Sequence, residues 1–260
     1  MNIICCIKQV PATDTIRFDP EKGTLIREGL EAEINPYDLF ALEASVQLKE
    51  ACGGKVTVIS MGPPQAEEAI REAISRGADH GVLLSDRAFA GSDTLATTYI
   101  LAKAIETVGE WDVVICGKQT TDGDTAQVGP GLAMRLNCPC ISCVEGIEPL
   151  EDKRFSIRRR LEEGVYTLEV EAPFLVTVEM GTYNPRVPSL KGKMRAKKAE
   201  IPIFTKDTID AEGEKIGLSG SPTSVDSTYV PEFKGTHEII EGTPQEQVAT
   251  LMEIFKEAGI

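Results

Sequence analysis

The chain has 260 residues, of which 42% are hydrophobic and 26% are charged, and this composition is typical of globular proteins. Its formal net charge of −14 argues against nucleic-acid binding, because such binding needs a basic surface. No apolar run reaches the ~18 residues of a membrane span, and no signal-peptide pattern opens the chain. We therefore expect a cytoplasmic protein without a membrane span.

Strand and helix patterns alternate along roughly the first 145 residues. Asn35 is placed as the N-cap of the first helix, with Pro36 at its first position. This alternation predicts a parallel sheet that is covered by helices on both faces. The predicted strands lie at 2–8, 55–62, 81–85 and 111–116. The predicted helices lie at 35–53, 63–78 and 92–109, with a fourth that ends near Asn137.

The pattern changes after residue 140, where turns separate strand-like runs and leave no room for helices. We interpret these runs as antiparallel strands appended to the parallel sheet. They lie at 138–150, 153–163, 164–172 and 174–180. The predicted fold is therefore α/β, a Rossmann-like doubly wound and mostly parallel sheet with appended antiparallel strands.

The C-terminal part of the chain has few apolar runs between residues 181 and 242. An unstructured segment of this length is unusual inside one compact domain, so we expect an arm that lies on another subunit. Thr243 and Glu246 then form a capping box that opens an amphipathic helix. The apolar side of this helix carries Val248, Leu251, Met252 and Phe255. The fold is thus expected to end in a long arm with a helix that packs on a partner.

The seven cysteines are interpreted as buried thiols, because disulfides are rare in cytoplasmic proteins. Cys138, Cys140 and Cys143 lie close together in the sequence. Closed zinc or iron–sulfur sites usually use four ligands in paired spacing, which these three cysteines do not provide. The sequence therefore predicts structural cysteines and no metal site.

A glycine-rich loop, GKQTTDGDTAQVGPG at 117–131, follows the fourth predicted strand. In an open α/β sheet, ligands bind beyond the carboxyl ends of the strands, where a helix N-terminus favours phosphate. Gly117 and Gly123 would let the backbone approach a ligand closely. The loop matches neither the P-loop nor the G-x-G-x-x-G pattern, so a nucleotide-phosphate site and a structural turn both stay open. Further loops at the same end of the sheet lie at 34–38, 60–64 and 91–98.

Acid–base chemistry has few candidate residues in this chain, which contains two histidines. The sequence has no G-x-S-x-G turn, no H-E-x-x-H helix and no pairing of a nucleophilic cysteine with a histidine. We therefore expect no catalytic side chain, and any chemistry would come from a bound cofactor.

Five segments in consistent order resemble the beta subunit of electron transfer flavoprotein. The loop GKQTTDGDTAQVGP resembles the nucleotide signature of that family, and SLKGKMRAKKAEIP resembles its partner-recognition segment. The other three segments are NIICCIKQVP, NPYDLFALEASVQLKE and SMGPPQAEEAIREAISRGAD. The resemblance covers nearly the whole chain, and five matches at consistent spacing make it specific.

The resemblance implies a heterodimer with an alpha subunit that holds an electron-transferring FAD. It also implies an adenine nucleotide in the cleft of the beta subunit, which is AMP in conventional members and a second FAD in electron-bifurcating members. By position, the implied cofactor-binding residues are Cys6, Asn35, Pro36, Tyr37, Asp38, Met61, Asp93, Thr94, Thr97, Gly117, Lys118, Gln119, Thr120, Thr121, Asp122, Gly123, Asp124, Thr125, Ala126, Gln127 and Val128.

The loop resembles the bifurcating type, because Gly123 stands where conventional members carry an acidic residue. The segment DRAFAGSDTLATT resembles that type as well. This implies a flavin that is reduced by NADH and passes electrons to the alpha-subunit FAD and to a low-potential acceptor such as ferredoxin or flavodoxin. A conventional subunit with structural AMP and a stand-alone nucleotide-binding regulatory protein are the alternatives.

A basic segment near residue 190 stands out in this acidic chain. On composition alone it is a solvated surface loop. The resemblance implies instead that it docks a flavin dehydrogenase, of the acyl-CoA type or another, through Leu190, Lys191, Lys193, Met194 and Arg195. The expected organisation is a nucleotide-binding domain at 1–185, a partner-recognition loop at 186–200, and an arm and helix on the alpha subunit at 201–260.

Overall fold

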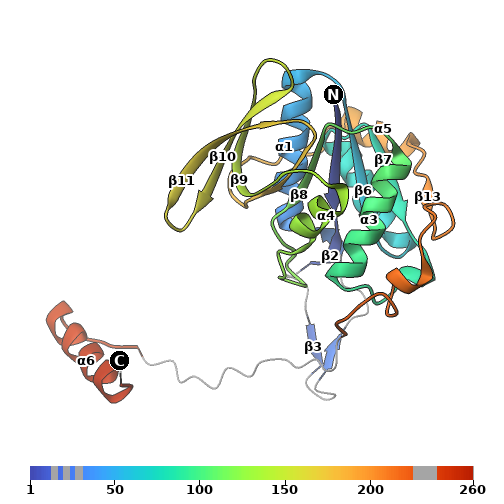
Figure 1. Cartoon of the computed structure of the whole chain (residues 1–260). Coiled ribbons are helices and arrows are strands. Elements are labelled where there is room, and N and C mark those ends of the chain that lie inside the picture. Colours follow the sequence, from blue (N-terminus) through green and yellow to red (C-terminus); the bar gives the residue numbers. More distant parts are fainter. Residues whose placement is uncertain (13–16, 20–23, 27–31, 225–238, 260) are drawn as a thin grey trace. The chain divides into compact units, whose positions relative to one another are not determined.

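The computed structural model describes residues 1–12, 17–19, 24–26, 32–224 and 239–259 (Figure 1). The chain divides into two compact units, Met1–Ser224 and Val225–Ile260. No helix within the described ranges is long and apolar enough to cross a bilayer.

The first unit is built around one large sheet, which has nine strands among the described residues, in the order β11-β10-β9-β12-β8-β1-β6-β7-β13. The pairs from β9 through β12, β8, β1, β6 and β7 to β13 are all parallel, whereas β10 is antiparallel to β9 and β11. The strands are β1 (Asn2–Ile7), β6 (Lys55–Met61), β7 (His80–Leu84), β8 (Val113–Gly117), β9 (Cys140–Pro149), β10 (Arg154–Leu161), β11 (Gly164–Glu171), β12 (Phe174–Val178) and β13 (Ile203–Phe204).

Helices cover both faces of this sheet, as the sequence predicts. Successive residues of β1 enter different cores: Ile3 and Cys5 pack with residues of α1 and α2, whereas Ile4 and Cys6 pack with residues of α3 and α4. Burial on both faces explains why the central strands appear as continuous apolar runs. The helices of this unit are α1 (Pro36–Cys52), α2 (Glu67–Arg76), α3 (Thr94–Val108), α4 (Val128–Leu136) and α5 (Leu190–Lys198).

The remaining elements of the first unit are short. Two antiparallel pairs join β2 (Gln9–Pro11) to β5 (Ala32–Ile34) and β3 (Arg17–Asp19) to β4 (Thr24–Ile26). The 3₁₀ helices among the described residues of this unit are η2 (Pro64–Ala66), η3 (Arg87–Phe89) and η4 (Gly213–Lys215). The α/β class, the doubly wound parallel sheet and the antiparallel extension are thus confirmed.

One strand differs from the prediction. We expected β12 among the antiparallel strands, but it lies between β8 and β9 and is parallel to both. All five of its residues, FLVTV, are buried. A strand in the middle of a sheet with both faces covered has this pattern, whereas an alternating pattern marks a strand with one solvated face. The antiparallel extension therefore consists of β9, β10 and β11.

The predicted arm begins later than expected. Residues 201–224 belong to the first unit, because β13 pairs with β7 and because Ile209, Ala211 and Ile216 are buried in the core beside α3. Their apolar side chains are single and irregularly spaced, so no helix or strand period reveals them. The second unit is counted only from Val225 onward.

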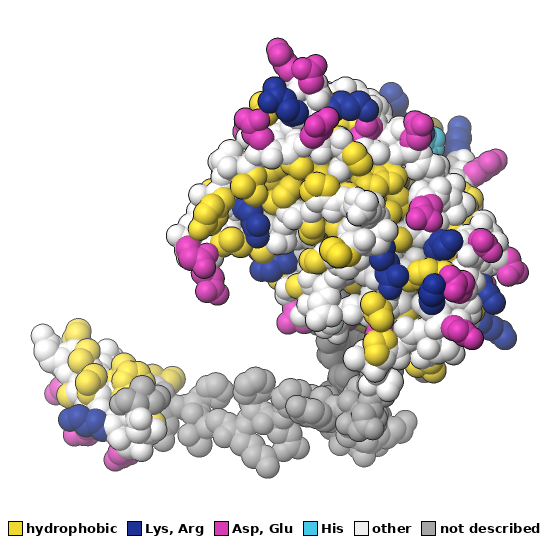
Figure 2. Space-filling view, viewed as in Figure 1, with side chains coloured by type: hydrophobic (Ala, Val, Ile, Leu, Met, Phe, Trp, Pro, Cys, Tyr) yellow, Lys and Arg dark blue, Asp and Glu magenta, His cyan; other side chains and the backbone are white. Residues whose placement is uncertain are grey.

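The second unit contains α6 (Pro244–Glu257), which begins as predicted. The Thr243 side chain accepts from the Glu246 N–H, and the Glu246 carboxylate accepts from the Thr243 N–H, so the capping box is formed. Figure 2 shows apolar side chains along this helix. They are all exposed within the described part of the chain, and they are Val248, Leu251, Met252, Ile254 and Phe255. The surface that covers them stays a prediction.

The predicted burial of the cysteines is correct only in part. Cys5, Cys6 and Cys116 are buried in the central strands, but Cys52 and Cys140 are exposed. Cys52 ends α1 and Cys140 begins β9, where the sheet and its helices leave the chain open to solvent. Within the described residues, no group of three His, Cys, Asp or Glu side chains is placed to hold a metal ion.

Candidate functional site

The strand order places a switch point between β1 and β8 (Figure 1). From β1 the chain moves outward to β6 and β7, and α3 then carries it back to β8 on the other side of β1. The connections that leave the carboxyl ends of β1 and β8 therefore diverge to opposite faces. In open α/β sheets this divergence forms the crevice in which ligands bind. Lys8 follows β1 here, and Gly117 ends β8.

The first turn of α1 joins these two strand ends. Asn35 is fully buried, and its backbone N–H donates to the Lys8 carbonyl at 2.8 Å. Its side-chain amide donates to the Gln119 carbonyl at 2.8 Å and accepts from the Thr121 N–H at 3.1 Å. We expected this side chain to cap α1, but it makes no capping hydrogen bond. The glycine-rich loop uses both ends of the amide instead.

Asp38 makes the second connection between the strand ends. Its carboxylate accepts from the Lys8 N–H at 2.8 Å and from the Gly117 N–H at 3.2 Å. Burial raises the pKa of this carboxyl to about 7, although the hydrogen bonds that it accepts lower the pKa in part. A Cβ at Gly117 would lie 2.3 Å from the Asp38 carboxylate. The packing of Asp38 therefore requires glycine at this position, and the close approach of a ligand to Gly117 stays a prediction.

Ion pairs fix two further points of the loop. The Lys8 ammonium lies 2.6 Å from the Asp122 carboxylate, and the Lys118 ammonium lies 2.9 Å from Glu179, just beyond β12. Lys8 is a site residue that we did not predict. The only local signal for it is its position directly after a buried strand, at the edge where the candidate ligand loops meet. A cation here offsets the negative charge of the loop.

The loop backbone is irregular and largely exposed. Asp124 and Ala126 have φ angles of 51° and 54°, a left-handed conformation that is unfavourable for residues with a side chain. Backbone in such sparsely populated conformations gathers at ligand sites. Gly123 is exposed and does not have this conformation, and a Cβ there would meet only the Thr120 hydroxyl at 3.2 Å. The chain's own packing therefore does not require glycine at this position.

The N-termini of α3 and α4 border the loop and differ in one respect. Asp93 caps α3 by accepting from two backbone N–H groups, and it also accepts from Thr223. α4 has no side-chain cap, and within the described residues the N–H groups of Val128 and Gly129 make no hydrogen bond. The uncapped end of α4 can therefore receive an anion.

The structure brings most of the predicted cofactor residues to this crevice. The bonds of Asn35 and Asp38 join the end of β1 to residues 117–121, and the Thr94 hydroxyl lies 3.1 Å from the Gln127 side chain. Met61 ends β6, the neighbour of β1, at the same edge. The side chains of Asn35 and Asp38 are buried and hydrogen-bonded to other residues of the chain. Five residues of the loop are exposed: Asp122, Gly123, Asp124, Thr125 and Gln127.

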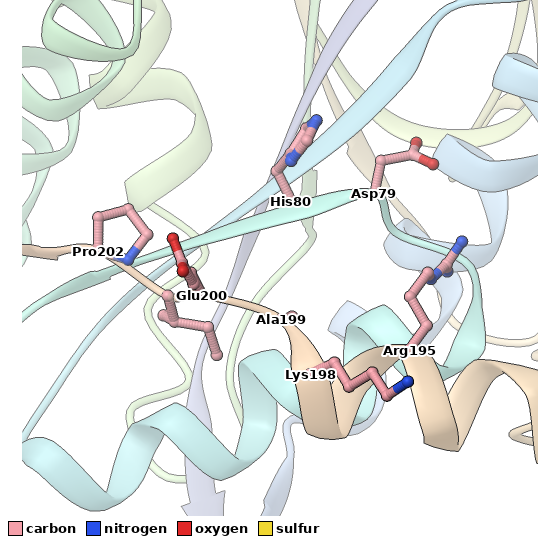
Figure 3. Close-up of a pocket in the computed structure, with 8 residues that line it drawn as sticks. Asp79, His80, Arg195, Lys198, Ala199, Glu200 and Pro202 are labelled. Carbon is pink, nitrogen blue, oxygen red and sulfur yellow. The ribbon is translucent and has the colours of Figure 1, made fainter.

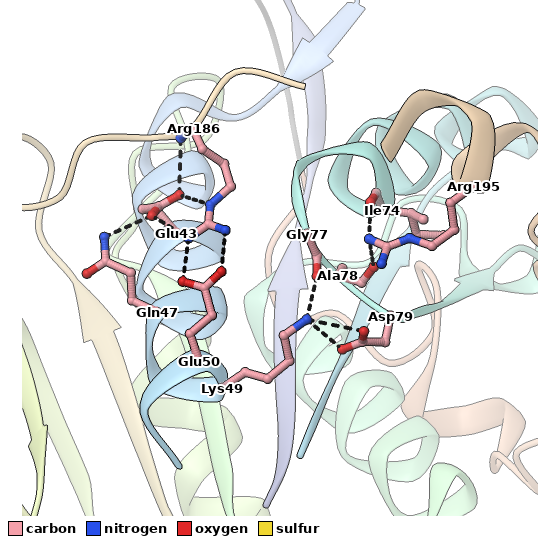
Figure 4. Close-up of polar contacts among 10 residues, drawn as sticks. All are labelled: Glu43, Gln47, Lys49, Glu50, Ile74, Gly77, Ala78, Asp79, Arg186 and Arg195. Carbon is pink, nitrogen blue, oxygen red and sulfur yellow. Dashed lines mark hydrogen bonds and ion pairs between the residues drawn. The ribbon is translucent and has the colours of Figure 1, made fainter. Parts of the chain in front are cut away.

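The basic segment is a helix, α5, rather than the loop that we expected. Leu190 and Met194 are 78% and 58% exposed, and the side chains of Lys191 and Lys193 are exposed as well. Arg195 differs, because its guanidinium donates to the carbonyls of Ile74 and Ala78 at the end of α2 (Figure 4). It holds α5 on α2, and so it is less available to a partner than the lysines.

Close packing keeps α5 on α2. A Cβ at Gly192 would lie 2.1 Å from the Ser75 carbonyl oxygen, so only glycine permits this approach. Arg71 of α2 donates to the carbonyl of Ala196 at 2.6 Å. Leu190 therefore projects from a fixed helix, which is a suitable arrangement for an apolar anchor.

A partly buried ion-pair network fixes the chain just before α5 (Figure 4). The Arg186 guanidinium lies 2.9 Å from Glu43 and 2.6 Å from Glu50, both on α1. The side chain of Glu43 is only 5% exposed. Burial raises the pKa of Glu43, but the bonds from Arg186 and Gln47 outweigh burial and hold the pKa below its usual value. The chain before α5 is thus held on α1, and α5 itself is held on α2.

A cavity of about 760 Å³ lies at the opposite edge of the sheet, where β7 begins (Figure 3). Asp79, His80, Arg195, Lys198 and Glu200 are among the residues that line it, and most of them are exposed. None of the predicted cofactor residues lines this cavity. Because ligands of open α/β sheets bind at the carboxyl edge, we place the candidate site at the switch point and not here.

Comparison with known proteins identifies the family. A family model described as "Electron transfer flavoprotein domain" matches residues 22–209. The chain belongs to the electron transfer flavoprotein family. Membership makes it part of an electron-transport flavoprotein, and its similarity to beta subunits implies an alpha-subunit partner.

Three relatives illustrate the range of this family. The "Electron transfer flavoprotein subunit beta" of Thermoanaerobacterium thermosaccharolyticum is 48% identical, over 97% of each chain. The "Protein FixA" of Azorhizobium caulinodans is 45% identical, over 98% of this chain and 94% of its own. The "Caffeyl-CoA reductase-Etf complex subunit CarD" of Acetobacterium woodii is 44% identical, over the whole of both chains.

Proposed function

We propose that the chain is the beta subunit of an electron-bifurcating electron transfer flavoprotein and that it binds FAD at the switch point. The observation that carries this proposal is Gly123. The position is exposed beside an uncapped helix N-terminus, and the chain's own packing does not require glycine there. A glycine that the fold does not need leaves room for a ligand, and the missing carboxylate avoids repulsion of a pyrophosphate.

The residues of the crevice fit a dinucleotide. The open N–H groups of Val128 and Gly129 suit a phosphate, and Lys8, which pairs with Asp122, supplies a cation to the same loop. The chemistry that FAD supplies when bound is acceptance of a hydride from NADH and delivery of electrons to the alpha-subunit FAD and to a low-potential acceptor such as ferredoxin or flavodoxin. The residues of this chain bind and orient the cofactor, and we assign no acid–base role to any of them.

Two surfaces support the proposed partners. The exposed apolar side of α6 suits a cover supplied by the alpha subunit, because an uncovered amphipathic helix is costly in water. The exposed Leu190 and the lysines of α5 suit a flavin dehydrogenase. The name of the Acetobacterium relative, a subunit of a caffeyl-CoA reductase complex, favours an acyl-CoA type of dehydrogenase for this chain too. We place the complex in the cytoplasm.

The replacement Gly123→Asp tests the proposal. It restores the acidic residue of conventional subunits, so we expect the complex purified with its alpha subunit to lose FAD from the beta site. Gly213→Asp is the matched control, because Gly213 is also exposed, has no positive φ and carries no tight neighbour. Unchanged FAD content in Gly123→Asp, or an equal loss in Gly213→Asp, would contradict the role given to Gly123.

A further inference from the structure

Asn35 occupies an N-cap position without capping its helix. Asparagine at an N-cap usually accepts from the second or third N–H of the helix. Here the backbone angles at Asn35 are φ −45° and ψ 127°, and the side chain makes no such bond. The first turn of α1 therefore gives up a common source of stability. The side chain of Asn35 must be used elsewhere, since a fully buried amide without partners would be costly.

Both ends of the Asn35 amide contact one short piece of the glycine-rich loop. The Nδ2 atom donates to the carbonyl of Gln119, and the Oδ1 atom accepts from the N–H of Thr121. The amide thus makes the same donor and acceptor bonds that a neighbouring strand would make, and it fixes the backbone of residues 119–121. Because Asn35 also donates its own N–H to Lys8, this part of the loop is tied to the end of β1 as well.

The loop beyond Thr121 needs such support. Asp124 and Ala126 adopt positive φ angles, which a free loop would leave quickly. Lys8 holds Asp122 and Thr94 contacts Gln127 from outside the loop, whereas Asp124 is held from within it: its N–H donates to the Thr120 carbonyl, and Gln119 contacts its side chain. Both of these bonds begin at residues 119–120, which the Asn35 amide holds. The support therefore passes from Asn35 through residues 119–121 to Asp124.

We propose that Asn35 is a positioning residue, which holds residues 119–121 so that the following loop and the N-terminus of α4 are preorganised for a pyrophosphate. Asn35 has no exposed surface, and its amide bonds Gln119, Thr121 and the Asp38 carboxylate, so we assign it a positioning role in place of the direct cofactor contact that the resemblance implied. The proposal rests on the proposed nucleotide site, but the claim that Asn35 holds residues 119–121 concerns the loop alone and can be tested without a ligand.

The test compares Asn35→Ser with Asn35→Ala in the complex of the full-length chain and its alpha subunit, freed of nucleotide. Serine is a good N-cap, so it preserves the start of α1, but it is too short to reach the loop. Hydrogen exchange should quicken at least about tenfold at residues 119–124 in both variants, the effect of losing two buried bonds. Exchange in α1 should stay slow in Asn35→Ser, which shows that the fold is kept.

ADP is the binding probe, because it carries the adenosine shared by AMP and FAD together with a pyrophosphate. We expect both variants to bind ADP more weakly than wild type, by up to about 30-fold. Wild-type loop exchange in Asn35→Ser would overturn the proposal, because the loop would then keep its conformation without the Asn35 amide. If the loop exchange quickens but ADP affinity stays within about threefold, the loop does not position the ligand, and the proposal fails.

Two further results separate this proposal from the proposed function. A wild-type complex that binds neither ADP nor FAD contradicts the nucleotide site itself, whatever the exchange of the loop. If Asn35→Ala does not fold, Asn35→Asp replaces it, because aspartate keeps the acceptor for Thr121 and loses the donor to Gln119. Faster exchange at residues 119–124 is expected in that variant, and unchanged exchange there overturns the positioning role.

Discussion

Replacing Asp38 by asparagine should change how the stability of the chain depends on pH. Burial raises the pKa of Asp38 from 3.8 to about 7 in the folded protein. Between these two values the folded state keeps a proton that the unfolded state has lost. The contribution of Asp38 to the free energy of unfolding is therefore complete below about pH 4 and decreases as the pH rises through 7.

The size of this effect follows from the shift in pKa. One pKa unit corresponds to about 1.4 kcal/mol, so the rise of Asp38 corresponds to about 4 kcal/mol between pH 4 and pH 8. Asp38→Asn also leaves one of the N–H groups of Lys8 and Gly117 without its acceptor, a loss of about 1–3 kcal/mol that does not vary with pH. Only the pH-dependent part identifies the buried carboxyl.

Urea unfolding followed by circular dichroism measures this difference. The free energy of unfolding of wild type minus that of Asp38→Asn should fall by about 4 kcal/mol between pH 4 and pH 8. Asp112→Asn is the control. Burial raises the pKa of Asp112, but bonds from Asn2 and Lys153 outweigh burial and hold it below its usual value, so its contribution is lost only as the pH falls below about 4. Parallel pH profiles for wild type and Asp38→Asn would refute the reasoning.

Three further changes test other parts of the structure. Arg186→Met leaves the Glu43 carboxylate buried and poorly paired, so urea unfolding should show a decrease of about 3 kcal/mol in the free energy of unfolding. This is the lower end for a buried pair, because Arg186 is one-third exposed. A decrease below about 1 kcal/mol would show that the pair is unimportant for stability. Ala126→Gly relieves a positive φ angle, so it should raise the free energy of unfolding by about 1 kcal/mol, and a decrease would argue against that conformation. Leu190→Ala removes an exposed side chain, so it should slow electron delivery to the dehydrogenase without changing stability or flavin reduction by NADH; if delivery is unchanged, Leu190 is not an anchor.

The parallel core was predictable because its signals are local. Strands such as β1 are buried on both faces and show up as apolar runs, and Gly53 and Gly77 follow α1 and α2 as glycine commonly does. The capping box at Thr243 is local too. The position of β12 between β8 and β9 was not predictable, because strand order depends on contacts between segments that are far apart in the sequence.

The candidate site was predictable in place but not in detail. The glycine-rich loop lies at the switch point, as its position after the fourth strand indicated. The role of Asn35 was not visible, because a local pattern offers only the N-cap, and the loop that captures its amide lies 84 residues further along the chain. The helix α5 was hidden for the same reason. Its glycine and its charges suggest a loop, and the contacts of Arg195 with α2 span 117 and 121 residues.

The central claim is that FAD binds at the switch point of this chain. The chain is purified together with its alpha subunit and denatured, and the released nucleotides are separated by chromatography and counted against protein. We predict two FAD for each heterodimer, one from each subunit. One FAD together with one AMP would contradict the claim and would assign the chain to the conventional type.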